Sequence, residues 1–269
     1  MKWVRFIRNS TPSFGVLNGD TIVSTSLAWA DILAGRKPDS GPEFKLTSVQ
    51  LLAPVERPGK LIAIGKNYWD HCRETNSPPP DWPIIFTKFP TAIIGPGAAI
   101  TWSAALTQEV DFEAELGVVI GRTARRVAEV DALDYVFGYT AANDVSARDL
   151  QFGDGQWVRG KSLDTFCPLG PALVTADDIP DPQQLAIRCE LNGATMQDSN
   201  TSEMIFNVAH LVSFCSQAFT LEPGDVIVTG TPHGVGAFRD PKVFMKHGDQ
   251  IVVEIEGIGR LANPCVVED

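Results

Sequence analysis

Apolar and acidic residues alternate along Val110-Asp111-Phe112-Glu113-Ala114-Glu115-Leu116. Successive side chains of an extended strand point to opposite faces, so this spacing predicts a strand with Asp111, Glu113 and Glu115 on one face. Like charges on one face repel each other unless solvent screens them or a hard cation with oxygen ligands binds between them. The segment therefore predicts a β-strand whose acidic face is either solvated or part of a metal site.

Similar short apolar runs, bounded by turn residues, predict further strands on both sides of this segment. The predicted strands cover residues 61–64, 84–87, 110–120, 135–143, 185–191, 226–229 and 251–255, and residues 185–197 form a hairpin that turns on Asn192-Gly193.

One helix is predicted to follow Thr201 and Ser202, which are candidate N-caps. Its apolar residues recur with a 3.6-residue period: Met204, Ile205, Val208, Leu211, Val212 and Cys215. Strands dominate, so we predict an α+β fold with mixed β-sheets.

The first residues predict a small antiparallel unit. Short β-type runs at residues 3–7, 14–17 and 21–23 surround Asn18-Gly19, which is typical of a type I′ hairpin turn. Pro54, Pro58 and Gly59 then interrupt the chain. We therefore expect a small N-terminal β-rich domain at residues 1–57 and a larger domain at residues 58–269.

The composition is that of a globular protein, with 44% hydrophobic and 20% charged residues, and it rules out a mainly disordered chain. A net charge of −11 at pH 7 would repel nucleic acid or an anionic membrane, whereas it is compatible with divalent cations. The five cysteines have no C-x-x-C spacing, no apolar signal region is visible at the N-terminus, and no uncharged stretch is apolar enough to span a bilayer. We therefore expect a cytoplasmic protein with reduced thiols.

Asp144 lies where a strand rich in aromatic residues and Thr ends and a helical turn begins. Such an Asp commonly caps a helix by accepting free backbone N–H groups. It could also complete an oxygen site with Glu113 and Glu115. That set would suit Mg²⁺ or Mn²⁺ and would leave coordination positions for water or substrate.

His71 and Glu74 are three residues apart and would share one face of a helix. A carboxylate that accepts a hydrogen bond from one ring nitrogen orients the imidazole and raises its basicity, so that the other nitrogen can accept a proton. The alternative is an ordinary surface pair. His210, His233 and His247 have no comparable neighbour, and His210 is interpreted as structural because it lies near the apolar stripe of its helix.

Residues 155–162, Gly-Gln-Trp-Val-Arg-Gly-Lys-Ser, match the P-loop pattern G-x-x-x-x-G-K-[ST]. A P-loop requires a buried strand before it and a helix after it, whereas Pro168 and Gly170 interrupt the segment that follows. We therefore reject nucleotide binding. Lys161 can still serve as an ammonium group that binds an anion.

Several motifs together resemble the fumarylacetoacetate hydrolase superfamily over residues 58–269. They are Gly65-Lys66-Asn67-Tyr68 leading to His71 and Glu74, the acidic segment 110–116, Gly138-Tyr139-Thr140 leading to Asn143-Asp144-Val145-Ser146-Ala147-Arg148-Asp149, Arg159-Gly160-Lys161-Ser162, and Thr229-Gly230-Thr231-Pro232.

The resemblance implies a catalytic domain with a β-roll of mixed sheets, usually in a homodimer. It implies a divalent metal, Mg²⁺ or alternatively Mn²⁺ or Ca²⁺, held by Glu113, Glu115 and Asp144. It also implies a water-activating pair, a lysine that contacts the bound oxo acid, and substrate contacts. The water-activating pair would be His71 and Glu74, and the lysine would be Lys161. The substrate contacts would be Gln151, Thr231 and Arg148.

From this resemblance we expect a metal-dependent hydrolase that cleaves a C–C bond of an acylpyruvate or fumarylpyruvate-type 2-oxo acid. The alternative is an isomerase, tautomerase or decarboxylase of a 2-oxo or 2-hydroxymuconate-type dicarboxylic acid of aromatic catabolism. A non-catalytic binding protein on the same scaffold would have no need of the His71 and Glu74 pair.

Overall fold

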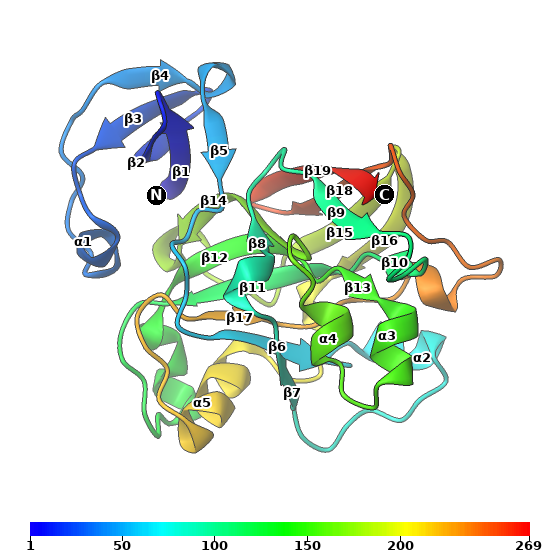
Figure 1. Cartoon of the computed structure of the whole chain (residues 1–269). Helices are drawn as coiled ribbons and strands as arrows, with labels where there is room; N and C mark the ends of the chain where they lie inside the picture. The colour runs from blue at the N-terminus through cyan, green and yellow to red at the C-terminus, as the bar shows by residue number, and fades with distance from the viewer.

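The computed structural model describes residues 1–269, and its largest element is a sheet of twelve strands (Figure 1). The strand order is β4 (Glu43–Lys45), β3 (Thr21–Thr25), β2 (Thr11–Asn18), β1 (Lys2–Arg8), β14 (Cys167–Thr175), β12 (Val136–Asn143), β11 (Ala114–Ile120), β17 (Val226–Val228), β6 (Leu61–Gly65) and β7 (Ile84–Thr87). In addition, β5 (Gln50–Leu52) pairs with β1, and β8 (Ile93–Ile94) pairs with β14.

A second sheet has five strands in the order β16 (Ala194–Asn200), β15 (Ala186–Leu191), β18 (Gln250–Ile255), β19 (Gly259–Glu268) and β9 (Ile100–Ser103). Two short strands, β10 (Val110–Asp111) and β13 (Ser146–Ala147), form a separate pair. Most neighbouring strands are antiparallel, but β6 with β17, β8 with β14 and β9 with β19 are parallel. The sheets are therefore mixed, as the sequence predicts.

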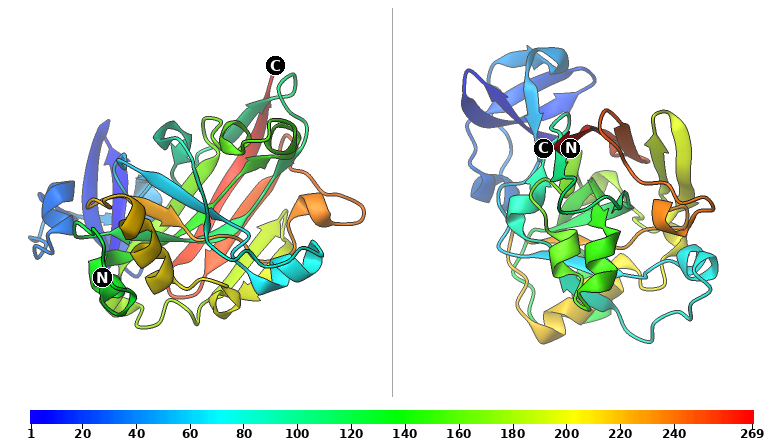
Figure 2. Two further views of the ribbon diagram at one scale, coloured as in Figure 1. Left: turned by 90° about the horizontal axis from the view of Figure 1, so that it is seen from below. Right: turned by 45° about the vertical axis from the view of Figure 1, so that its right-hand side comes forward.

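The α-helices are few and short. They are α1 (Trp29–Leu33), α2 (Trp69–Glu74), α3 (Arg148–Gly153), α4 (Val158–Lys161) and α5 (Val208–Ala218). Both views of Figure 2 place α2 (cyan) beside the 3-10 helix η6 (Gly236–Phe238, orange). None of the helices has the length and apolarity needed to cross a membrane.

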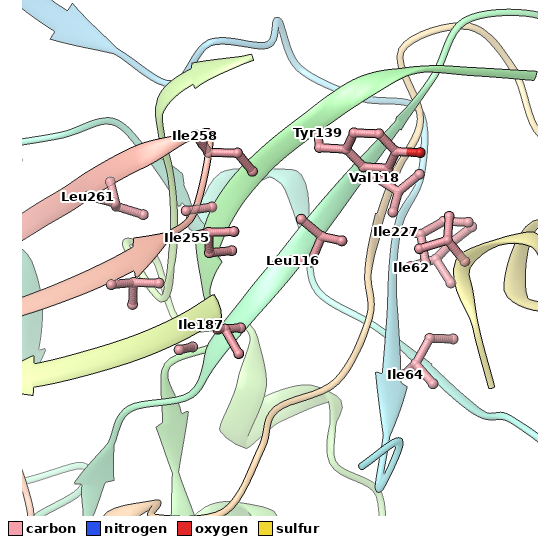
Figure 3. Close-up of a cluster of buried hydrophobic side chains, with 14 of the residues drawn as sticks. Ile62, Ile64, Leu116, Val118, Tyr139, Ile187, Ile227, Ile255, Ile258 and Leu261 are labelled. Atoms are coloured by element: carbon pink, nitrogen blue, oxygen red, sulfur yellow. The ribbon is translucent and has the colours of Figure 1, made fainter. Parts of the chain in front are cut away.

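The main hydrophobic core joins the two sheets. Figure 3 shows Leu116 and Val118 of β11 in one buried cluster with Ile187 of β15 and Ile255 of β18. Burying one such side chain stabilises the fold by roughly 1.5 to 3 kcal/mol. The opposite face of β11 carries Val119, which belongs to a second buried hydrophobic cluster. Every residue of β11 is therefore buried. The core therefore fixes the strand that carries Glu115.

The N-terminal strands continue the large sheet. Lys2 of β1 lies opposite Val174 of β14, and Trp3 packs in the same cluster as Val119. The boundary expected near residue 57 lies in the connection between β5 and β6. The division into two domains at that point stays a prediction.

The acidic segment is not one continuous strand. β10 ends at Asp111 and β11 begins at Ala114, so Phe112 and Glu113 lie outside both strands. The prediction of an unbroken strand over residues 110–120 was therefore wrong. The break separates Asp111 from Glu113 and Glu115, because β10 pairs with β13 whereas β11 pairs with β12.

Two local predictions need correction. Helix α5 begins at Val208 and its cap is Asn207, whose side chain accepts the N–H of His210, whereas Thr201 and Ser202 belong to a preceding 3-10 helix. The turn after β2 contains Gly19 and Asp20 rather than Asn18 and Gly19, because Asn18 pairs with Thr21. The sequence reasoning also missed β14, which the prolines at positions 168 and 171 disguise.

Candidate active site

The ends of β11 and β12 bring together the three carboxylates that the sequence predicts as metal ligands. Glu113, Glu115 and Asp144 are buried, and one oxygen from each lies within 4.8 Å of the other two. Backbone contacts hold the two strand ends together, because the N–H of Asp144 donates to the carbonyl of Glu113 and the N–H of Glu113 donates to the side chain of Asn143. A purely solvated acidic face is therefore excluded.

Lys161 lies between two of these carboxylates. Its ammonium is 2.8 Å from Glu113 Oε2 and 2.9 Å from Asp144 Oδ2. Burial alone would lower the pKa of Lys161, but Asp144 and Glu113 raise it. Lys161 therefore stays a cation at neutral pH, which suits a group that stabilises negative charge.

The three carboxylates differ in how well nearby positive charges compensate their negative charge. Burial alone would raise the pKa of Glu113, but the charges of Lys161 and Arg148 outweigh burial and lower that pKa to about 2. Burial raises the pKa of Glu115, and the charges of Asp144 and Glu113 raise it further. Glu115 accepts the N–H of Gly230 at 2.8 Å. An additional cation would relieve this repulsion, so the all-oxygen set fits a divalent metal ion of the Mg²⁺, Mn²⁺ or Ca²⁺ type.

The His71 and Glu74 pair forms on α2 as expected. His71 Nδ1 is 3.1 Å from Glu74 Oε2, and Glu74 Oε1 accepts the N–H of Gly234 at 2.9 Å. The side chain of His71 is 10% exposed, and its ring packs edge-on against the ring of Phe238. With Nδ1 bound to the carboxylate, Nε2 is the nitrogen that remains for proton transfer.

The three expected substrate contacts are buried near the triad. Arg148 Nη1 is 2.7 Å from Glu113 Oε1 and 2.9 Å from Gln151 Oε1. Thr231 Oγ1 accepts a hydrogen bond from Gln197 Nε2 at 2.8 Å. The structure thus brings Arg148 into direct contact with Glu113 and brings Gln151 there through Arg148. Thr231 is linked through Gln197 to the backbone of Ala114, the residue between Glu113 and Glu115. Their contacts with substrate stay a prediction.

Asp111 has a role other than the one its spacing predicts. Its Oδ2 accepts Nε of Arg148 at 2.8 Å, and its two oxygens accept the N–H groups of Gly236 and Ala237. Asp111 therefore positions Arg148 and does not belong to the triad.

Two further residues of the site were missed. Lys88, fully buried, contacts Asp144, and Gln197, fully buried, accepts the N–H of Ala114. A lysine directly after the apolar run 84–87 was the only sequence signal for Lys88. The P-loop interpretation fails in the structure as well, because helix α3 occupies the position where a P-loop requires a strand.

Comparison with known proteins settles the family. The sequence profile described as "Fumarylacetoacetate (FAA) hydrolase C-terminal" matches residues 60–266, and a profile described as "Rv2993c-like, N-terminal" matches residues 1–54. The chain belongs to the fumarylacetoacetate hydrolase family. The resemblance inferred from the motifs is confirmed.

Relatives within the fumarylacetoacetate hydrolase family have several names. A Bos taurus protein named oxaloacetate tautomerase FAHD2A, mitochondrial, is 52% identical over 227 residues, which cover 84% of this chain and 72% of the relative. The Homo sapiens protein of the same name is 49% identical, with the same coverage of each chain.

Solved structures of this family match the whole chain. The fumarylacetoacetate hydrolase of psychrophilic Exiguobacterium antarcticum is 39% identical, with a TM-score of 0.91. The 5-carboxymethyl-2-hydroxymuconate delta-isomerase of Mycobacterium smegmatis is 40% identical, with a TM-score of 0.87. Each likeness covers 100% of both chains. The names of these relatives include tautomerases and isomerases as well as a hydrolase.

Proposed function

We propose that this protein is a divalent-metal-dependent tautomerase or isomerase of a 2-oxo dicarboxylic acid, with the keto and enol forms of oxaloacetate as its substrate pair. The observation that carries this proposal is the His71 and Glu74 pair, linked through the backbone of residues 230–234 to a buried oxygen triad, in a chain 52% identical to a protein named oxaloacetate tautomerase. The C–C hydrolysis expected from the sequence has weaker support, because these relatives favour the alternative.

The triad supplies the place for the metal. Glu113, Glu115 and Asp144 would hold Mg²⁺ or Mn²⁺. When bound, such a cation polarises the 2-oxo group and neutralises part of the charge on the adjacent carboxylate.

His71 would act as the base. Its Nε2 takes a proton from the carbon next to the 2-oxo group, while the electron pair of that C–H bond becomes the C=C bond of the enolate. The protonated imidazole would then return that proton to the enolate oxygen, so the reaction adds and removes no atom. Lys161 remains an ammonium beside Glu113 and Asp144 and stabilises the developing negative charge. Tautomerisation therefore requires only one base, His71.

Hydrolysis of a C–C bond is the second candidate. The same imidazole could activate a water molecule, and a solved structure with a TM-score of 0.91 is named a fumarylacetoacetate hydrolase. Hydrolysis requires a water nucleophile in addition to the base.

The test compares both reactions in one preparation. Purified protein, stripped of metal and reloaded with Mg²⁺, is given enol oxaloacetate and an acylpyruvate, and the ultraviolet absorbance of each substrate is followed. We expect fast loss of the enol signal, a dependence on metal, and little acylpyruvate cleavage.

His71→Gln and a matched control make this test specific. His210 also has a carboxylate partner, with Nδ1 3.0 Å from Glu129 Oε2, but it packs against Phe206 away from the triad. His71→Gln should abolish most of the enzymatic rate, whereas His210→Gln should retain it. Acylpyruvate cleavage without tautomerisation would overturn the proposed reaction.

The expected homodimer and cytoplasmic location stay predictions. Light scattering of the purified protein should report a mass near twice 29.2 kDa if the dimer forms. A monomer at micromolar concentration would contradict it. The five cysteines are free and buried.

A further inference from the structure

One segment of backbone, residues 230–237, donates its N–H groups to the carboxylates that build the site. Gly230 donates to Glu115 at 2.8 Å, and Gly234 donates to Glu74 at 2.9 Å. The same segment binds Asp111, as described above. It therefore connects a predicted metal ligand with the carboxylate that orients His71.

The same segment binds one more carboxylate, Asp70, to which the proposed mechanism gives no role. Asp70 Oδ1 accepts the N–H of His233 at 3.2 Å, and Asp70 Oδ2 accepts the hydroxyl of Ser199 at 2.5 Å. Its side chain is 11% exposed. Asp70 and Glu74 are four residues apart on α2, so they share a helix face and meet the consecutive N–H groups of His233 and Gly234.

The segment is a firm support for these contacts. Gly234 has φ +98, and a Cβ there would lie 2.2 Å from the carbonyl oxygen of Met196. Arg239 donates to the carbonyls of both Gly234 and Met196, which fastens the segment to β16. The positions of the His233 and Gly234 N–H groups are therefore fixed from outside α2.

Helix α2 depends on such contacts. It has six residues, and helices of that length are unstable in water without tertiary contacts. Its start is tied down by Asn67, which bonds the backbone of Phe206 and Thr229. Its other side-chain ion pair, Arg73 with Glu203, is exposed and contributes little.

Without Asp70, Glu74 would have to attach α2 to the segment 230–237 and orient the imidazole of His71 at the same time. One of its oxygens is bound to Gly234 and the other to His71. Any rocking of α2 about its start would therefore move the imidazole relative to Glu113. Asp70, a second carboxylate on the same helix face, adds two contacts that would oppose this motion.

We propose that Asp70 is a positioning residue that fastens α2 to His233 and Ser199 and thereby fixes the position of His71 relative to the metal-binding carboxylates. It acts through His71 and touches no substrate. Its expected effect on catalysis rests on the proposed function, whereas its effect on the helix does not.

The test uses a graded set of variants. Asp70→Ala removes both acceptors, Asp70→Asn keeps one carbonyl acceptor for His233, and Ser199→Ala removes one donor. Asp198→Ala is the matched control, since Asp198 precedes Ser199 on β16 but pairs with exposed Arg188. Hydrogen exchange is measured at the amides of Cys72 in α2 and of Thr75, its C-cap, which donate to the carbonyls of Tyr68 and His71.

We expect Asp70→Ala to speed exchange at these two amides about tenfold or more, as lost hydrogen bonds to a charged group would do. Exchange in β11 and β18 should not change. The kcat of tautomerisation should fall about tenfold while KM stays within about twofold, because base placement changes but the metal-binding carboxylates do not. Asp70→Asn should recover most of both losses, Ser199→Ala should show smaller ones, and Asp198→Ala should match the wild type.

Unchanged α2 exchange in Asp70→Ala would overturn the proposal, as would faster exchange spread evenly over the whole protein. Equal loss of kcat in Asp70→Asn and Asp70→Ala without faster α2 exchange would also overturn it, since charge rather than attachment would then be responsible. If the wild type does not tautomerise oxaloacetate but α2 exchange responds as expected, the proposed function fails and the attachment of α2 stands.

Discussion

The buried ammonium of Lys88 lies 2.5 Å from Asp144 Oδ1, on the carboxylate that Lys161 contacts through Oδ2. Lys88 also donates to the carbonyls of Val145 and Lys161. A single side chain thus ties the end of β12 to α4. Each oxygen of Asp144 is bound by a different lysine, so the orientation of this carboxylate toward a metal is restricted.

Replacing Lys88 should therefore destabilise the protein strongly. In Lys88→Met, the buried Asp144 carboxylate loses one counter-ion, and breaking a buried pair from one side costs roughly 3 to 5 kcal/mol. Urea unfolding of the metal-free protein measures the change in the free energy of unfolding. Lys45→Met is the control, because Lys45 pairs with Asp20 on the surface, and it should leave the urea midpoint almost unchanged. Equal midpoints for both variants would contradict this role of Lys88.

Glu115→Gln should have opposite effects on stability and on metal binding. The substitution removes a charge that Asp144 and Glu113 repel, and its amide oxygen can still accept the Gly230 N–H. The melting temperature of the metal-free variant should rise above that of the wild type. The further rise on adding Mn²⁺, which reports binding to the folded state, should shrink or vanish. A Mn²⁺ response equal to that of the wild type would remove Glu115 from the metal site.

The sequence predicts those strands that form a local apolar pattern, whereas it missed β14 and β19. Apolar runs near residues 61–64, 84–87 and 251–255 all become strands, and Asn192-Gly193 becomes a turn with positive φ at both residues. The triad was also predictable, because Glu113 and Glu115 lie in one short segment and Asp144 follows a recognisable strand.

The remaining parts of the site depend on contacts between distant residues. Lys88 contacts Asp144 across 56 residues, and Asp111 contacts the segment 230–237 across about 125 residues. No local periodicity records such pairings. The break at Phe112 and Glu113 was also missed because it depends on a contact between distant residues. The alternating sequence pattern continues through the break, and only the backbone hydrogen bond between Asp144 and Glu113 marks it.

The contribution of Glu74 to stability should depend on pH. Burial alone would raise the pKa of Glu74, but hydrogen bonds from His71 and from the Gly234 N–H lower it below its ordinary value of 4.5. A folded-state pKa below the unfolded one means that ionised Glu74 stabilises the fold above about pH 4.5, and that this stabilisation is lost as the pH falls through the folded-state pKa. The melting temperature of Glu74→Gln should therefore be lower than that of the wild type at pH 7, and the two should converge as the pH falls below the folded-state pKa of Glu74. A difference that grows toward acid pH would contradict the pairing.

Arg148 and Asp111 should be energetically coupled. Both side chains are almost fully buried, Arg148 donates through Nε to Asp111, and its Nη1 contacts Glu113. In Asp111→Asn the guanidinium keeps only one anionic partner, and in Arg148→Gln the Asp111 carboxylate keeps only backbone donors, the N–H groups of Phe112, Gly236 and Ala237.

Each single variant thus leaves a buried charge less compensated, whereas the double variant removes both charges. We expect the double variant to lose less stability than the sum of the two single losses, by about 1 kcal/mol or more, as for other contacting buried pairs. Urea unfolding of the wild type and the three variants gives this coupling free energy. Arg188→Gln with Asp198→Asn is the matched surface cycle, and it should give a much smaller coupling because both side chains are about half exposed. Additive losses at Asp111 and Arg148 would mean that Arg148 is held by Glu113 and Gln151 instead, and that Asp111 serves only to anchor the segment 230–237.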